Sequence, residues 1–154
     1  MSTSPTPCRV LYVEDNPGDA VLLQTVLSHG RVPFEVTVLD DGEEAMQFIG
    51  SNPFRPDVIV LDIHIPMIDG LTILAALKAD PHLKSTPVLV FVSPNSPNSK
   101  RAAALKADLC MAKPCDLDGY RQLGQVIWRL LSKSLVAGYT PASRDSLPKW
   151  LADP

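Results

Sequence analysis

Four charged residues could form one chemical site in this chain, because each of them lies at the end of a predicted strand. Asp62 closes an all-apolar run, and Glu14 and Asp15 follow a second such run. Lys113 ends a third apolar segment and precedes Pro114. Carboxylate oxygens are the ligands that hard divalent cations prefer, and an ammonium supplies a point charge for anionic groups. These residues therefore predict a divalent-cation site with an acceptor group beside it.

The composition is that of an ordinary globular protein. The chain has 154 residues, of which 45% are hydrophobic and 20% charged, with a net charge of −3. This length suits one domain with a sizeable core. The densest positive cluster is Lys100 and Arg101, which argues against nucleic-acid binding. Apolar runs reach only about six residues, far below the roughly 20 that span a bilayer, so no membrane segment is expected.

The two ends of the chain differ in pattern from its centre. Residues 1–7 lack the charged and apolar regions of a signal peptide, and the sequence predicts a disordered lead there. Residues 8–133 form the predicted domain, and 134–154 a C-terminal extension without clear periodicity. The three cysteines are scattered and lack partners at zinc-like spacing, which favours reduced thiols and a cytoplasmic location.

Short apolar runs alternate with longer amphipathic stretches between residues 8 and 133. The runs predict strands at about 8–13, 35–39, 57–62, 87–92 and 109–112, and the stretches predict helices at about 17–29, 42–50, 70–79, 99–107 and 116–133. Five such units, with strands that are apolar on both sides, indicate an α/β fold whose parallel sheet has helices on both faces.

Ligands of such sheets bind outside the carboxyl ends of the strands, where the strand order reverses. That rule places Glu14, Asp15, Asp62, Ser93 and Lys113 around one crevice, because each comes just after a predicted strand. The crevice is therefore the candidate functional site.

Several motifs in the predicted order resemble the receiver domain of bacterial two-component response regulators. They are the segments 13–20 and 61–70, Ser93, and the Lys113-Pro114 step, and the resemblance covers about residues 8–133. It implies a flavodoxin-like (βα)5 fold, doubly wound, with a five-stranded parallel sheet of order 2-1-3-4-5.

Three further features resemble the stand-alone regulators that pair with bacterial and cyanobacterial phytochrome kinases. They are the segments 40–45 and 77–81 and the extension after the last helix. The resemblance then implies a sensor histidine kinase as phosphodonor, most specifically a phytochrome.

The resemblance assigns a role to each residue of the crevice. Asp62 accepts the phosphoryl group, with Mg2+, or Mn2+ or Ca2+ in its place, as cofactor. Asp15 and Asp62 bind the metal directly together with the backbone carbonyl of His64, while Glu14 acts through a water. Lys113 and Ser93 contact phosphoryl oxygens. Such a protein catalyses its own phosphorylation and dephosphorylation without being a metabolic enzyme.

Each of these residues also has a plainer interpretation. Glu14 and Asp15 can be an acid pair that caps the next helix. Lys113 can be a surface lysine, although the Lys113-Pro114 step resembles the family's cis peptide, which aims the ammonium into the crevice. Ser93 can be a turn residue, and the side chain of His64 is expected to face solvent. The occurrence of all of them together favours the site.

The chain departs from the family pattern around its predicted fifth strand. Cys110 stands where the family has an aromatic switch residue, so the usual relay from the site is in doubt. The segment between Ser93 and Lys113 is about two residues shorter than is usual for the family, which predicts a short or irregular fourth helix. Cys115 replaces a bulky apolar residue.

The last helix has an apolar arc of about 200°, wider than the roughly 100° that a one-sided helix needs. Trp128 is expected at the edge of this arc, beside Arg121, as part of a partner surface. The sequence thus predicts a homodimer through the fourth and fifth helices and the C-terminal extension. Tyr139 and Trp150 are among the extension residues that could dock, with disorder as the alternative.

Competing functions remain open at the level of sequence. A constitutive dimeric scaffold or phosphate sink is the main alternative, and Cys110 favours it. A haloacid-type phosphatase would need a second acid where His64 stands, and a flavin carrier would not place Glu14 and Asp15 beside a phosphate.

Overall fold

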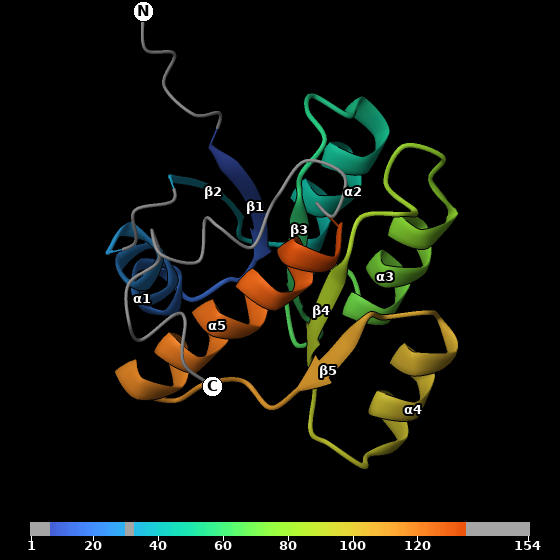
Figure 1. Cartoon of the computed structure of the whole chain (residues 1–154). Coiled ribbons are helices and arrows are strands. Elements are labelled where there is room, and N and C mark those ends of the chain that lie inside the picture. The colour runs from blue at the N-terminus through green and yellow to red at the C-terminus, as the bar shows by residue number, and fades with distance from the viewer. Residues whose placement is uncertain (1–6, 30–32, 135–154) are drawn as a thin grey trace, which may run out of the picture.

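The computed structural model describes residues 7–29 and 33–134 of the chain (Figure 1). Residues 1–6 of the predicted lead and residues 135–154 of the predicted extension, with Tyr139 and Trp150, lie outside the described residues. Strands and helices alternate, with these bounds: β1 Cys8–Val13, α1 Pro17–Ser28, β2 Phe34–Leu39, α2 Gly42–Ser51, β3 Val58–Asp62, α3 Gly70–Ala79, β4 Val88–Phe91, α4 Pro97–Ala104, β5 Leu109–Met111 and α5 Leu117–Ser134.

The five strands form one parallel sheet in the order β2-β1-β3-β4-β5, as predicted. The side chains of β1, β3 and β4 are almost all buried, whereas those of the edge strands β2 and β5 are partly exposed. The register aligns Val13 with Leu61, and Asp62 with Phe91. The residues that follow β1, β3 and β4 therefore emerge at the same edge of the sheet.

Helices cover both faces of the sheet (Figure 1), and a hydrophobic cluster lies on each face. One joins α1 and α5 to the sheet, and the other joins α2 and α3 with Ala102 of α4. Alternation of side chains along the strands divides them between the clusters, so that Val10 and Tyr12 face α5 while Leu11 and Val13 face α2 and α3. The prediction of helices on both faces is confirmed.

Trp128 corrects one prediction about α5. Its side chain is only 8% exposed and belongs to the cluster between α5, α1 and the sheet. A helix that packs against both a sheet and a neighbouring helix buries a wider arc than one that rests on a single surface. The wide apolar arc of α5 therefore includes Trp128 in the core, and Trp128 does not mark a partner surface.

Local signals explain where the helices begin. Asn16, Asp41, Asp69 and Ser96 each accept a hydrogen bond from a backbone amide of the first turn that follows. Helix α4 has eight residues and begins with Pro97, which confirms the expectation of a short fourth helix. No helix within the described part of the chain is long and apolar enough to cross a membrane.

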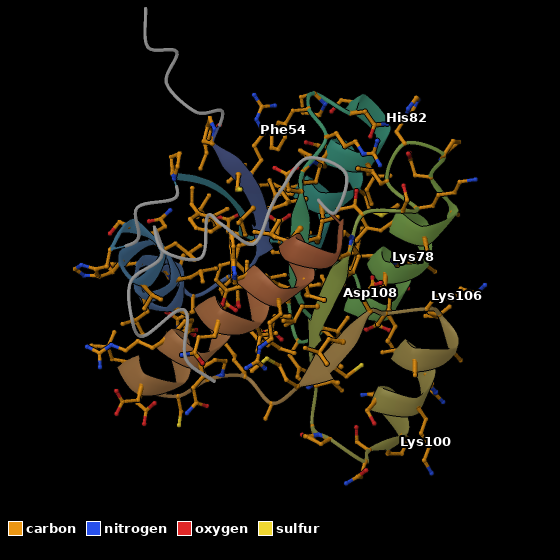
Figure 2. The ribbon with its side chains drawn as sticks, in the orientation of Figure 1. Phe54, Lys78, His82, Lys100, Lys106 and Asp108 are labelled. Carbon is orange, nitrogen blue, oxygen red and sulfur yellow. The ribbon has the colours of Figure 1, made fainter. Side chains whose placement is uncertain are left out.

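A polar contact joins α3 to the segment before β5. The ammonium of Lys78 lies 2.9 Å from a carboxylate oxygen of Asp108 and also donates to the carbonyl of Thr86 (Figure 2). The same Asp108 oxygen accepts from the amide of Val88 at 2.7 Å. This network fixes the amino end of β4, at the edge of the sheet opposite the crevice.

Two glycine substitutions should change stability in opposite directions. A Cβ at Gly70 would lie 2.3 Å from Cα of Ile63, whereas nothing lies within 4 Å of a Cβ at Gly50. We expect Gly70→Ala to lower the free energy of unfolding by about 1–3 kcal/mol. Gly50→Ala, within α2, should raise it by about 0.5–1 kcal/mol. Urea unfolding measures both, and equal stability of the two variants would contradict the packing at Gly70.

Candidate functional site

The end of β1 delivers two acids with different surroundings. The backbone amide of Glu14 donates to the carbonyl of Leu39, which continues the pairing of β1 with β2. The side chain of Glu14 is buried, and one of its oxygens accepts from the amide of Asn16 at 3.1 Å. Asp15 is exposed. Asn16, rather than either acid, caps α1, so the helix-capping interpretation of the acid pair is wrong.

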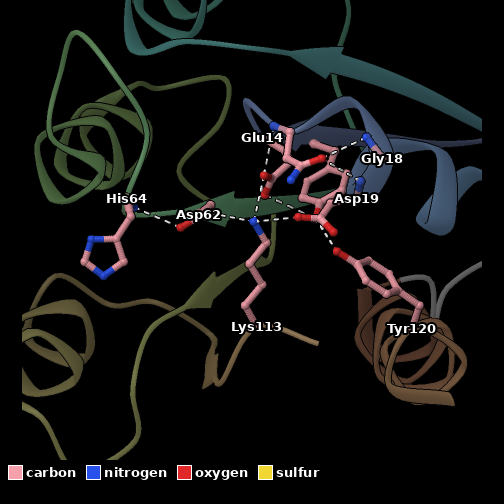
Figure 3. A network of polar contacts seen from close by, with 9 residues as sticks. Glu14, Gly18, Asp19, Asp62, His64, Lys113 and Tyr120 are labelled. Atoms are coloured by element: carbon pink, nitrogen blue, oxygen red, sulfur yellow. Dashed lines mark hydrogen bonds and ion pairs between the residues drawn. The ribbon is translucent and has the colours of Figure 1, made fainter. Parts of the chain in front are cut away.

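Asp62, the last residue of β3, is 4% exposed. Its Oδ1 accepts from the backbone amide of His64 at 2.9 Å, while Oδ2 faces the ammonium of Lys113 (Figure 3). The side chain of His64 is exposed, as predicted. A carboxylate with one oxygen on a backbone amide has a fixed orientation, so the direction of Asp62 is set by the loop that follows it.

Glu14, Asp15 and Asp62 meet the donor requirement of a hard cation. Each offers a carboxylate oxygen, and these oxygens all lie within 4.8 Å of one another. Oxygen ligands at this separation can converge on one divalent ion. Two carboxylates about 4 Å apart repel by roughly 4 kcal/mol at an effective dielectric constant of 20, so the cluster gains from added positive charge. The residues present therefore support a divalent cation.

Lys113 brings its ammonium into this cluster. Its Nζ lies 2.7 Å from Glu14, 2.9 Å from Asp19 and 3.1 Å from Asp62 (Figure 3). Within the described residues no peptide bond is cis, so the step from Lys113 to Pro114 is trans, contrary to the expectation. The trans form is the lower in energy, and the long side chain of lysine reaches the carboxylates from it.

Burial and charge act on the site in opposite directions. Burial raises the pKa of the Glu14 carboxyl, although the hydrogen bond from Lys113 opposes this shift. Burial would lower the pKa of the Lys113 ammonium, but hydrogen bonds to Glu14, Asp19 and Asp62 outweigh it and raise that pKa. Lys113 therefore stays charged at neutral pH, and its charge stabilises the ionised form of buried Glu14.

Ser93 follows β4 and Cys110 lies on β5. Ser93 is exposed and follows β4 by two residues, at the carboxyl edge of the sheet. Cys110, on β5, is partly buried, and its sulfur lies 4.0 Å from the carbonyl of Ser99 on α4. Burial raises the pKa of the Cys110 thiol, which keeps the thiol neutral. The position expected to hold a mobile ring is thus filled by a small side chain.

Sequence reasoning missed two parts of the site. Asp19, in the first turn of α1, pairs with Lys113, and the hydroxyls of Tyr12 and Tyr120 lie 3.4 Å apart beside Glu14. A signal existed for Tyr12, because residues two apart on a strand face the same side. The ion pair with Lys113 places Asp19 at the strand ends, but that contact depends on the rotation of α1 and leaves no local signal. Tyr120 lies more than a hundred residues away and leaves no local signal.

The acidic character extends beyond the cluster. Glu14 and Asp15 also line an open hollow of about 350 Å³ together with Asp40 and Glu44. Another hollow, of about 330 Å³, is lined by residues that include Phe54 and His82, which lie at the other end of the molecule (Figure 2). None of the predicted site residues lines that second hollow.

The chain is similar to known signalling proteins over most of its length. The family model for the response regulator receiver domain matches residues 10–123. Response regulator Rcp1 of Synechocystis sp. is 38% identical over 99 residues, which cover 60% of this chain and 67% of that protein. A protein-glutamate methylesterase of Methanospirillum hungatei is 36% identical over 75% of this chain, which spans only 34% of that relative.

Solved structures agree with the sequence comparison. The phosphorylated cyanobacterial phytochrome response regulator RcpA has a TM-score of 0.72 and 32% identity, covering 94% of this chain and 100% of its own. The Mn2+-bound form of Rcp1 has a TM-score of 0.66 and 28% identity, covering 92% and 99%. The strand order predicted for a flavodoxin-like fold is thereby confirmed.

Cation affinity should depend on the exposed acid of the cluster. We expect Asp15→Asn to weaken Mn2+ binding about tenfold, or 1.4 kcal/mol, because it removes one charged ligand. Isothermal titration calorimetry with Mn2+ measures this change. Glu35→Gln removes the same charge from β2, where Glu35 pairs in register with Arg9 near the opposite edge of the sheet, and should leave the affinity unchanged. Equal affinities of wild type and Asp15→Asn would contradict the cluster as the cation site.

Proposed function

The chain belongs to the family of response regulator receiver domains, and we propose that it accepts a phosphoryl group on Asp62 from a sensor histidine kinase. The observation that carries this proposal is the position of the Lys113 ammonium, 3.1 Å from Asp62 and 2.7 Å from Glu14. That arrangement puts positive charge next to an oriented, nearly buried carboxylate. Phosphoryl transfer depends chiefly on such positioning and charge neutralisation.

The proposed transfer is an in-line displacement. An oxygen of Asp62 forms a bond to phosphorus while the phosphorus–nitrogen bond of the donor's phosphohistidine breaks, and the electron pair stays on the imidazole nitrogen. Lys113 stabilises the charge on the phosphoryl oxygens, and the Ser93 hydroxyl donates to one of them. Attack of water on phosphorus then breaks the phosphorus–oxygen bond to Asp62 and releases inorganic phosphate, which keeps the proton of the water or passes it to solvent. The chain is thus proposed to promote both its own phosphorylation and its dephosphorylation.

The proposed cofactor is Mg2+, with Mn2+ or Ca2+ able to replace it. Asp15 and Asp62 would hold it directly with the carbonyl of His64, and Glu14 through a water. Its chemistry is to offset the charge of the carboxylates and the phosphoryl oxygens together. The separation of the three carboxylate oxygens supports this assignment.

Signalling is proposed to run through protein contacts in the cytoplasm. Similarity to Rcp1 and RcpA supports a phytochrome as the kinase. A homodimer through α4, α5 and the C-terminal extension remains our proposal, now without Trp128 as a contact. The domain itself is proposed to span 8–133, with 134–154 as the extension that serves assembly.

Cys110 favours a second candidate function, a dimeric scaffold or phosphate sink that switches little. A ring at this position would have to move when Ser93 engages a phosphoryl group, but a cysteine has no ring to move. Complete switching, from 1:99 to 99:1, needs about 5.5 kcal/mol of differential stabilisation. The two functions differ in whether phosphorylation changes the assembly.

Phosphorylation should depend on Asp62 and on a divalent ion. We expect wild type to incorporate label from radiolabelled phosphoramidate in the presence of Mg2+, and Asp62→Asn to incorporate none, because an amide oxygen is a poor nucleophile. EDTA should abolish labelling of the wild type. Asp69→Asn changes an acid in the following loop and should keep full labelling. Undiminished labelling of Asp62→Asn would overturn the assignment of the acceptor.

The dimer provides a separate test of switching. Beryllofluoride mimics the phosphoryl group, and sedimentation equilibrium with and without it measures the dissociation constant of the dimer. A signalling switch predicts at least a tenfold change in this constant, or about 1.4 kcal/mol. An unchanged constant, together with normal labelling at Asp62, would favour the scaffold.

A further inference from the structure

Asp19 contacts Lys113 but has no part in the proposed function. It lies in the first turn of α1, and its Oδ2 is 2.9 Å from Nζ of Lys113 (Figure 3). The side chain of Asn16 accepts from the amides of Gly18 and Asp19, which fixes the backbone at this point. Asp19 is therefore held beside the site by a helix cap.

Acids of the described chain surround the ammonium of Lys113: it donates to Glu14 and Asp62 and forms an ion pair with Asp19. An ammonium carries three N–H donors. Among the described residues, the carboxylates of Glu14, Asp19 and Asp62 lie within 3.1 Å of it. A phosphoryl oxygen that approaches Lys113 must replace one of these contacts.

Exposure decides which contact is replaced. The side chain of Glu14 is 0% exposed and forms the shortest contact, so its release would leave a buried charge unpaired. Asp62 carries the phosphoryl group and stays beside the ammonium. The side chain of Asp19 is 23% exposed, so water can solvate its carboxylate after release. Asp19 is the contact that is least costly to break.

We propose that Asp19 is a positioning residue that holds Lys113 in the unphosphorylated protein and competes with the phosphoryl group for its ammonium. This inference rests on the proposed function, because it needs a phosphoryl group on Asp62. The cost of breaking the Asp19 contact reduces the net stabilisation that the Lys113 ammonium provides to the phosphoryl oxygens. Because Asp19 belongs to α1, this helix loses a contact with Lys113 when Asp62 is phosphorylated.

The affinity for beryllofluoride tests the competition. With saturating Mg2+, 19F NMR titration should show that Asp19→Asn binds beryllofluoride about two- to fivefold more tightly than wild type, as expected for loss of a partly exposed ion pair. In a Lys113→Met background the same change should have no effect, because no ammonium remains to compete for. Asp118→Asn removes an equal charge from an acid that pairs with Arg121 and should leave the affinity unchanged.

Three results would overturn the inference. One is an unchanged affinity of Asp19→Asn, and another is an equal gain in the Lys113→Met background, which would indicate a simple charge effect. The third is a crystal structure of the beryllofluoride complex in which Lys113 Nζ keeps its contact with Asp19; we expect that distance to exceed 4 Å. This distance tests the competition even if the Lys113→Met variant binds beryllofluoride too weakly to titrate. Failure of wild type to bind beryllofluoride would instead overturn the proposed function itself.

Discussion

The ion pair between Lys113 and buried Glu14 is the interaction on which the site depends. Glu14 has a fully buried side chain, and a charge in that position needs a partner. Its partner comes from the far end of the chain, 99 residues later, after β5. The sheet order brings β1 and β3 side by side, so the same ammonium also reaches Asp62. The strand order therefore lets one ammonium both pair with the buried charge of Glu14 and contact the acceptor Asp62.

The sequence allowed prediction of the parts of this arrangement that have local causes. Apolar runs predict strands, and a charged residue directly after such a run must emerge at the strand end, which located Glu14, Asp15 and Asp62. The same reasoning placed the charge of Lys113 in the crevice, whereas the order of the strands needed the family resemblance. Asp19 and Tyr120 could not be predicted, because their contacts depend on the rotation of α1 and α5 about their axes and on side-chain rotamers. Neither the rotation of a helix nor a side-chain rotamer can be inferred from the residues nearby in the sequence.

Helix α5 illustrates why a pattern can be seen and still be misinterpreted. Its wide apolar arc is visible in the sequence and predicts a partner surface at Trp128. The arc instead matches two internal surfaces, the sheet and α1, and Trp128 packs between them. The peptide bond between Lys113 and Pro114 also differs from its prediction: it is trans rather than cis, and the flexible lysine side chain still reaches its partners.

The hydroxyl pair of Tyr12 and Tyr120 has a thermodynamic consequence for α5. Tyr120 is fully buried on α5, and through Tyr12 its hydroxyl adjoins the carboxylate of Glu14. The contacts from Tyr120 to Tyr12 and from Tyr12 to Glu14 thus connect α5 to the acids of the site. Linkage is reciprocal: if a protein that binds α5 disturbs this pair and so changes the affinity of the acids for a ligand, that ligand changes the affinity for the protein by the same factor. A receptor on the outside of α5 would in this way act as an effector of the pocket.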